Sequence, residues 1–201
     1  MAEARSIVWL KDIASGESRE AVLCENIHER HLTDVEEIWS SALRVLLRWA
    51  GRQEQSSHWD WRAKLQAVRG RRRLRALAIE CEGITQGLMI VDLSRRCRLE
   101  SQHGERLAYV DYVEVAPWNR ESWKPHRLFG SVGTALIRAA IQLSLDAGYL
   151  GRIGLHSLSR ANNFYHHLGM TDLGLDAAYE NLRYFEMTSL QAIRLQQDQV
   201  P

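Results

Sequence analysis

The sequence has few cysteines, no long apolar run and almost no net charge. Its three cysteines, Cys24, Cys81 and Cys97, cannot all pair within one chain, which argues against a disulfide-framed secreted domain. No stretch approaches the ~20 apolar residues of a transmembrane helix. The first apolar run, residues 7–10, is interrupted by charge too soon for a signal peptide. We therefore expect a soluble, cytoplasmic protein without a membrane partner.

Lysine and arginine number 26 and aspartate and glutamate 25, so the formal net charge is +1. This balance argues against wholesale coating of nucleic acid or of an anionic membrane, although it allows local basic patches. With 201 residues, 45% of them hydrophobic, the chain is long and apolar enough to bury one core. We predict a single domain over residues 1–201, with residues 1–30 as an N-terminal arm or as edge strands.

Hydrophobic periodicity predicts a mixed order of strands and helices. Apolar and β-branched runs predict strands at residues 6–10, 20–27, 74–82, 84–93, 107–115, 152–156, 171–173 and 184–187. Helical spacing predicts helices from about Thr33 to Gly51 and over residues 61–68, 132–146 and 159–168. Thr33 and Glu36 have the spacing of a capping box, and Ser159 is a candidate cap for the last helix. An antiparallel front half followed by a parallel crossover predicts one α/β domain.

The strongest strand, residues 107–115, leads to a glycine-containing turn that opens a helix. This turn, Gly130-Ser131-Val132-Gly133, resembles neither a P-loop nor a dinucleotide fingerprint. A helix N-terminus offers unpaired N–H groups to phosphate, and glycine lets the backbone approach it closely. Two glycines before a helix are by themselves more often an ordinary turn.

The order of strand, turn, helix, short strand and second helix resembles the GCN5-related N-acetyltransferase (GNAT) superfamily over about residues 74–187. The matching positions are Val115, Pro117, Gly133, Ala161, Tyr165, Leu168, Gly169 and Met170. The resemblance implies a mixed α/β fold, a central mixed sheet flanked by helices. It also implies acetyl-CoA as co-substrate and transfer of an acetyl group to a primary amine, a small molecule or a peptide.

The resemblance also assigns residues that hold the cofactor. They are the backbone N–H groups of Val113 and Val115, the turn residues Gly130, Ser131, Val132, Gly133 and Thr134, and Arg127 and Ala161. Ser131 stands where the family has a glycine and can replace it if its φ is negative. Leu128 stands where the family has Arg or Gln, and Leu158 where it often has Asn. Arg120, Lys124 and Arg127 either approach the 3′-phosphate of the cofactor or belong to a solvated loop.

Amine acetylation needs a base for the amine and an acid for the departing thiolate. Glu114 is the candidate base, because a carboxylate at the end of an apolar strand is unusual, and Asp111 is the competing carboxylate. Tyr165 matches the general acid of the family. His156 is a second candidate base, with a structural histidine as the alternative interpretation.

Other features are less specific. We interpret Cys24, His28 and His31 as surface residues and predict no metal, because no second ligand pair follows them. The basic run 69–75 is either a solvated helix end or a contact with RNA or an acidic peptide. The four tryptophans near the predicted site either stack on the acceptor or anchor the core; they are Trp59, Trp61, Trp118 and Trp123.

Two functional hypotheses follow. The first is an N-acetyltransferase that works by direct attack, since no cysteine occupies a motif position. The second is a catalytically inactive acyl-CoA-binding or RNA- or protein-interaction module on the same fold. If the acceptor is a macromolecule such as a charged tRNA or a protein terminus, the basic run 69–75 is the local feature that supports it.

Overall fold

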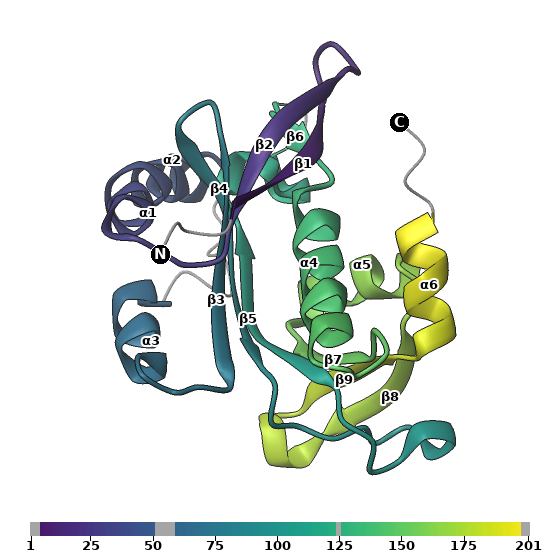
Figure 1. Ribbon diagram of the computed structural model, residues 1–201. Coiled ribbons are helices and arrows are strands. Elements are labelled where there is room, and N and C mark those ends of the chain that lie inside the picture. The colour runs from purple at the N-terminus through teal and green to yellow at the C-terminus, as the bar shows by residue number, and fades with distance from the viewer. Residues whose placement is uncertain (1–4, 51–58, 124–125, 198–201) are drawn as a thin grey trace. The chain divides into compact units, whose positions relative to one another are not determined.

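The computed structural model describes residues 5–50, 59–123 and 126–197. The chain divides into two compact units, Met1–Met89 with Val113–Leu136, and Ile90–Tyr112 with Ile137–Pro201. Figure 1 shows the elements of both units, which are described one at a time. None of the helices in the described ranges combines the length and the apolar composition of a membrane-crossing segment.

The first unit is built on antiparallel strands in the order β6-β1-β2-β3-β4. These strands are β1 (Arg5–Asp12), β2 (Ser18–Cys24), β3 (Leu74–Cys81), β4 (Ile84–Asp92, which continues into the second unit) and β6 (Phe129–Gly130). The β3–β4 hairpin turns at Glu82 and Gly83, whose φ angles of 54° and 76° suit a tight two-residue turn. The predicted hairpin is confirmed, whereas the two-residue strand β6 escaped prediction because it has no periodicity of its own.

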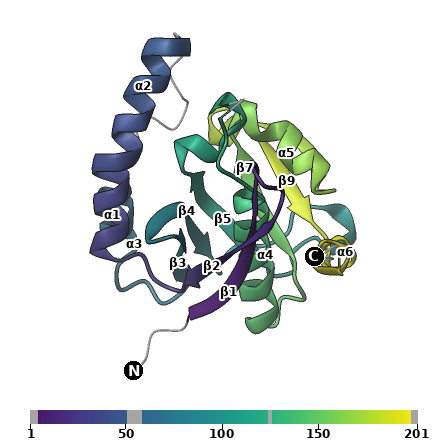
Figure 2. The same cartoon turned by 90° about the horizontal axis from the view of Figure 1, so that it is seen from above.

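The helices of the first unit are α1 (Glu29–Thr33), a π-helical segment (Asp34–Trp39), α2 (Ser40–Ala50) and α3 (Trp61–Val68). Figure 2 shows α2 continuing from α1. The prediction that this helix begins at Thr33 is wrong, because it begins at Glu29. His28 precedes it as the N-cap, and a capping box joins His28 and His31 in place of Thr33 and Glu36. The helix end predicted at Gly51 lies outside the described residues.

Trp39 and Asp34 attach this long helix to β4. The indole Nε1 of Trp39 donates to the Thr85 carbonyl at 3.0 Å, and Asp34 Oδ2 accepts from the Thr85 backbone N–H at 2.8 Å. The Trp39 side chain is only 1% exposed. Its burial anchors the helix to the sheet, since an aromatic side chain contributes a large buried apolar area and its N–H has found a partner.

The second unit contains strands in the order β5-β7-β9-β8. They are β5 (Ala108–Val115, which ends in the first unit), β7 (Ile153–Ser157), β8 (Thr171–Asp176) and β9 (Leu182–Met187). Strands β5 and β7 are parallel and β7–β9 and β8–β9 are antiparallel, so the sheet is mixed. Helix α4 (Val132–Asp146) joins β5 to β7, which confirms the predicted crossover.

Helices α5 (Asn162–His167) and α6 (Ser189–Gln197) complete this unit. The helix predicted from Ser159 begins at Asn162 instead, and Ser159 lies in a 3₁₀ turn that precedes it. Ala161 is the N-cap of α5, and no side chain caps this helix. Helix α6 was not predicted from the sequence.

Candidate functional site

A buried carboxylate lies near the end of β5. Glu114 is 8% exposed. The indole Nε1 of Trp61 donates to Glu114 Oε2 at 2.5 Å, and Arg120 Nη2 donates to Oε1 at 2.8 Å. Each oxygen of a carboxylate can accept more than one hydrogen bond. The structure therefore supplies a buried carboxylate whose orientation is fixed by an indole and a guanidinium group.

Local contacts fix Trp61, Arg120 and the end of the strand that carries Glu114. Trp61 is the first residue of α3, whose N-cap, Asp60, accepts a hydrogen bond from the Ala63 N–H at 2.9 Å. After β5, the Ala116 N–H donates to the Gln86 carbonyl at 2.9 Å. Arg120 Nε donates to the Val115 carbonyl at 3.0 Å, which fixes the guanidinium beside the carboxylate.

The tryptophans divide between the two interpretations. Trp118 is buried and donates to Gln86 Oε1 at 3.0 Å, so it anchors the core. Trp61 is buried too, but its polar end contacts Glu114. Trp59 is half-buried and lies edge-on to Trp61, with ring centroids 6.3 Å apart. Trp123 is half-buried within a 3₁₀ turn.

The turn before α4 retains a glycine-like backbone although its residue is serine. Ser131 has φ +66°, so the condition of a negative φ is not met. The Ser131 carbonyl accepts from the Ala135 N–H at 2.8 Å, which makes Ser131 the residue from which the helix starts. The first N–H groups of a helix, here those of Val132, Gly133 and Thr134, have no acceptor within it. Three donors and a positive dipole end thus point out of this turn.

Gly87 lets α4 approach β4 closely. A Cβ at Gly87 would lie 2.9 Å from Leu136 Cδ1 and 3.1 Å from Val132 Cγ1. Such contacts are shorter than van der Waals separation, so any larger residue would force the side chains of Leu136 and Val132 to move. The start of α4 is therefore held by the backbone of the sheet as well as by the turn.

Ser131→Gly is expected to stabilise the protein. A left-handed backbone costs a non-glycine residue roughly 1–2 kcal/mol, and the substitution removes this cost. Glycine loses more backbone entropy than serine on folding, which offsets part of the gain and leaves a net stabilisation of about 0.5–1 kcal/mol. Urea denaturation should show this increase in the free energy of unfolding. Ser131→Ala is the control and should give no such gain, because alanine carries the same Cβ. A decrease for Ser131→Gly would contradict the assigned backbone.

The arginines of the loop are already paired. Arg120 is bound to Glu114 and Val115 and not directed at a phosphate. Arg127 forms an ion pair with Glu121, and its Nε is buried without a hydrogen-bond partner. Lys124 lies outside the described residues. Of the two that the structure describes, Arg120 and Arg127, it is Arg127 that has a buried donor without a hydrogen-bond partner.

Tyr165 and Ala161 lie in the second unit. Tyr165 is buried on α5, with its ring centroid 5.5 Å from that of Phe185. Burial raises the pKa of its phenol, so the hydroxyl stays protonated. Within the described residues this hydroxyl makes no hydrogen bond, which leaves it able to donate. The Ala161 N–H donates to the Leu158 carbonyl at 2.8 Å, in the turn that starts α5.

The β5–β7 ladder covers only the first part of β5. The paired residues end at Val110 and Leu155, while β5 continues to Val115. Among the described residues, β7 is therefore not paired with the end of β5 that carries Glu114.

Comparison with known proteins identifies the fold. No protein-family profile and no curated protein matches the sequence. A GNAT-family acetyltransferase from Listeria monocytogenes 4b F2365 is 14% identical, with 84% of this chain and 95% of that chain covered and a TM-score of 0.53. The PaiA N-acetyltransferase from Thermoplasma acidophilum, solved with coenzyme A, is 12% identical over 94% and 99% of the chains, with a TM-score of 0.52. A tetramutant of the BH1408 protein from Bacillus halodurans is 17% identical over 77% and 96%, also with a TM-score of 0.52.

This chain has the GNAT fold. The predicted fold class, a mixed α/β structure with a mixed sheet and helices, is confirmed. Within the GNAT fold, Val113, Glu114, Val115 and the turn 130–134 belong to the first unit, and Ala161 and Tyr165 belong to the second.

His156 is fully engaged in hydrogen bonds. Its Nδ1 lies 2.6 Å from the Tyr109 hydroxyl and its Nε2 2.9 Å from Asp176 Oδ2, while its ring stacks on Tyr179 at a centroid distance of 4.0 Å. Both ring nitrogens therefore have partners. The competing carboxylate Asp111 is exposed on β5. Neither residue has the combination of burial and polar donors that surrounds Glu114.

The protein is expected to lose stability as the pH falls below about 6.5. Burial lowers the pKa of His31 and of His156 from 6.5, and hydrogen bonds from Arg98 and His156 lower the pKa of Asp176 from 3.8 to about 2. In each case the unfolded chain binds more protons between the two pKa values, so acid favours unfolding. The histidine contribution is complete above pH 6.5 and lost below it, and that of Asp176 is lost between about pH 4 and 2.

Urea denaturation at pH 7.5, 5.5 and 4 measures this loss. His156→Gln should weaken the pH dependence between 7.5 and 5.5, because glutamine keeps a polar side chain but does not titrate. Stability that is constant or rises on acidification would contradict the assignment.

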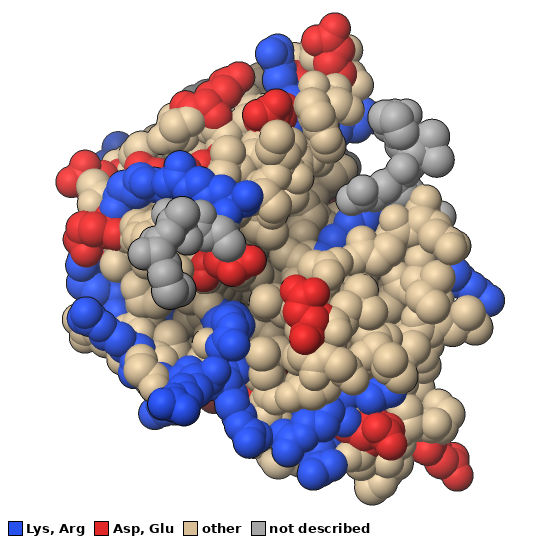
Figure 3. Space-filling model, viewed as in Figure 1, with Lys and Arg blue, Asp and Glu red and all other residues tan. Residues whose placement is uncertain are grey.

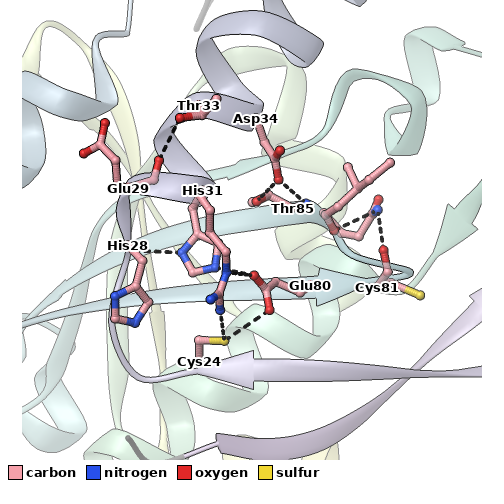
Figure 4. Close-up of polar contacts among 12 residues, drawn as sticks. Cys24, His28, Glu29, His31, Thr33, Asp34, Glu80, Cys81 and Thr85 are labelled. Carbon is pink, nitrogen blue, oxygen red and sulfur yellow. Dashed lines mark hydrogen bonds and ion pairs between the residues drawn. The ribbon is translucent and has the colours of Figure 1, made fainter.

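Cys24, His31 and Glu80 form a compact polar cluster in the first unit (Figure 4). The interpretation of Cys24 and His31 as surface residues is wrong, because both are 0% exposed. Their ligand atoms and a Glu80 oxygen lie within 4.8 Å of one another, a spacing that suits a metal ion. Arg30 also binds Glu80 and reaches Cys24 Sγ at 3.9 Å.

The hydrogen bonds of His31 argue against a metal in this cluster. The His28 backbone N–H donates to His31 Nδ1 at 2.9 Å, so Nδ1 carries no proton. In the neutral ring Nε2 then holds the proton and donates it to Glu80 Oε1 at 2.8 Å. A histidine that binds a metal through one nitrogen donates a proton from the other, and His31 Nδ1 accepts one instead. The cluster joins α1 to β2 and β3.

Proposed function

We propose that the protein is an acetyl-CoA-dependent N-acetyltransferase that acetylates a primary amine by direct attack. The observation that carries the proposal is the left-handed backbone of Ser131 at the start of α4. A serine in that conformation is costly, and such strain is typical of turns with a function. The fold, shared with an N-acetyltransferase solved with coenzyme A, supports the same assignment.

The start of α4 fits the pyrophosphate of acetyl-CoA. The N–H groups of Val132, Gly133 and Thr134 would donate to the phosphate oxygens, and Gly130 and Ser131 would form the turn around them. Arg127, with its unsatisfied Nε, is the basic residue proposed for the 3′-phosphate. Ala161 is proposed to close the cofactor site.

The protein's own residues account for each proton and for the carbonyl oxygen. Glu114 takes a proton from the amine, whose lone pair forms the new C–N bond. The N–H groups of Val113 and Val115 are the donors proposed to orient and polarise the thioester carbonyl. When the C–S bond breaks, Tyr165 gives its proton to the sulfur. The acyl donor supplies the activated acetyl group.

Calorimetric titration with acetyl-CoA, followed by assays of amine-dependent thiol release, tests this function. We expect micromolar binding at one site and release of free coenzyme A in the presence of an amine. Polyamines, amino acids and peptide N-termini form the first panel. If acetyl-CoA does not bind, the proposed function is wrong.

Tyr165→Phe is expected to lower the rate of transfer by about 10–100-fold, because general acid catalysis of this kind contributes up to 10²–10⁴-fold and water replaces part of it. Acetyl-CoA affinity and stability should change little, since phenylalanine keeps the ring packed on Phe185. Phe164→Leu, a change of the neighbouring ring, is the control. A native rate in Tyr165→Phe would remove Tyr165 from the mechanism.

The alternative is a module that binds acyl-CoA without turnover. Both oxygens of Glu114 already accept hydrogen bonds, and this favours a structural role for the carboxylate. Saturable binding of acetyl-CoA without thiol release for any amine of the panel would support this alternative.

A further inference from the structure

A cavity of about 660 Å³ lies in the first unit among the start of α1, the end of α3 and the start of β3. Figure 3 shows basic side chains gathered over α3 and its connection to β3. Arg69, Arg71 and Arg72 line the cavity together with the apolar side chains of Ile27 and Leu32. The volume is that of a small-molecule site.

The positive charge of the cavity is not balanced by its own acids. Arg62 also lines it, but this side chain is paired with Glu29 at 2.6 Å and with Glu36 at 2.8 Å. Within the described residues, the guanidinium groups of Arg69, Arg71 and Arg72 have no hydrogen bond or ion pair. Three like charges at one cavity repel one another, and an anion between them removes this repulsion.

The arginines project from a turn that is already ordered. The Arg71 N–H donates to the Val68 carbonyl at 3.1 Å, and the Leu74 N–H donates to the Arg71 carbonyl at 3.0 Å. Below them, Ile27 and Leu32 are only 7% and 4% exposed and form a fixed apolar floor. The cavity thus combines a basic rim with an apolar floor before any ligand arrives.

We propose that this cavity binds a phosphorylated small molecule of about nucleotide size. The planar guanidinium group matches two phosphate oxygens at once, which makes arginine the preferred residue for such contacts. The apolar floor would receive the non-phosphate part of the ligand. This site shares no residue with the turn 130–134 and does not depend on the proposed function.

Calorimetric titration with ADP tests the proposal. The test variant is Arg71→Ser/Arg72→Ser, and the charge-matched control is Arg48→Ser/Arg73→Ser, whose exposed residues do not line the cavity. Gly133→Glu separates this cavity from the start of α4. Because the start of α4 is itself proposed to bind a pyrophosphate group, the cavity variants are compared in the Gly133→Glu background. We expect one ADP to bind Gly133→Glu, and Gly133→Glu with the control substitutions, with similar affinity, and Gly133→Glu with the test substitutions at least tenfold more weakly.

Three results would overturn the proposal. One is the absence of binding by both ADP and pyrophosphate, and another is a loss of binding in the control equal to that in the test variant. The third is binding of a 20-nucleotide RNA, but not of ADP, with a steep salt dependence, which would assign the arginines to nucleic acid. As a second measurement, ADP should slow hydrogen exchange in residues 66–74 of the native protein, and unchanged exchange there would also reject the site.

Discussion

Glu114→Gln is expected to lower the rate of acetyl transfer by about 10²–10⁴-fold, the usual contribution of a general base. Glutamine has the shape of glutamate but cannot take a proton from the amine. Its amide oxygen can still accept from Trp61 or Arg120, so the strand should stay in place. Acetyl-CoA affinity should not change, because Glu114 is not among the groups proposed to hold the cofactor. Steady-state kinetics and calorimetry on the same samples measure both quantities.

Two controls make this result specific. Asp111→Asn removes the exposed carboxylate three residues earlier on β5 and should leave the rate unchanged. Trp61→Phe removes the donor to Glu114 Oε2 but keeps the base, and should reduce the rate less than Glu114→Gln does. Transfer by Glu114→Gln at the native rate would exclude Glu114 as the base. A loss in Asp111→Asn would transfer the role to that residue.

Gly133→Glu is expected to weaken acetyl-CoA binding by at least 100-fold. Gly133 is the second residue of α4, where the proposed pyrophosphate would approach the backbone. A glutamate there adds bulk and a negative charge that repels phosphate. The fold should remain intact, because a carboxylate in the first turn of a helix interacts favourably with the helix dipole. Calorimetric titration with acetyl-CoA measures the loss.

Gly133→Ala is the matched control for this substitution. Alanine adds only a methyl group and should weaken binding far less than glutamate does. Gln142→Glu adds the same charge to the exposed face of α4 and should not affect binding. If Gly133→Glu binds acetyl-CoA as the native protein does, the start of α4 is not the cofactor site.

Elements whose signals are local can be predicted from the order of the amino acids. The alternating run that forms β5, the helix α4 and the helix α3 were predicted within a residue of their observed bounds. Periodicity of side chains on a strand or helix depends only on neighbouring residues, so it can be recognised without the fold. The family resemblance extended this local information to the fold class.

Features that depend on long-range contacts appear only in the folded protein. The first helix starts at Glu29, and there the buried His31 bonds to Glu80, 49 residues away. Glu114 receives its donor from Trp61, 53 residues away, and the sequence shows no sign of that pairing. The backbone of Ser131 is left-handed although serine favours other conformations. Partners distant in sequence compensate the burial of His31 and of Glu114, and no local pattern records the backbone angle of Ser131. Only the folded chain therefore shows these three features.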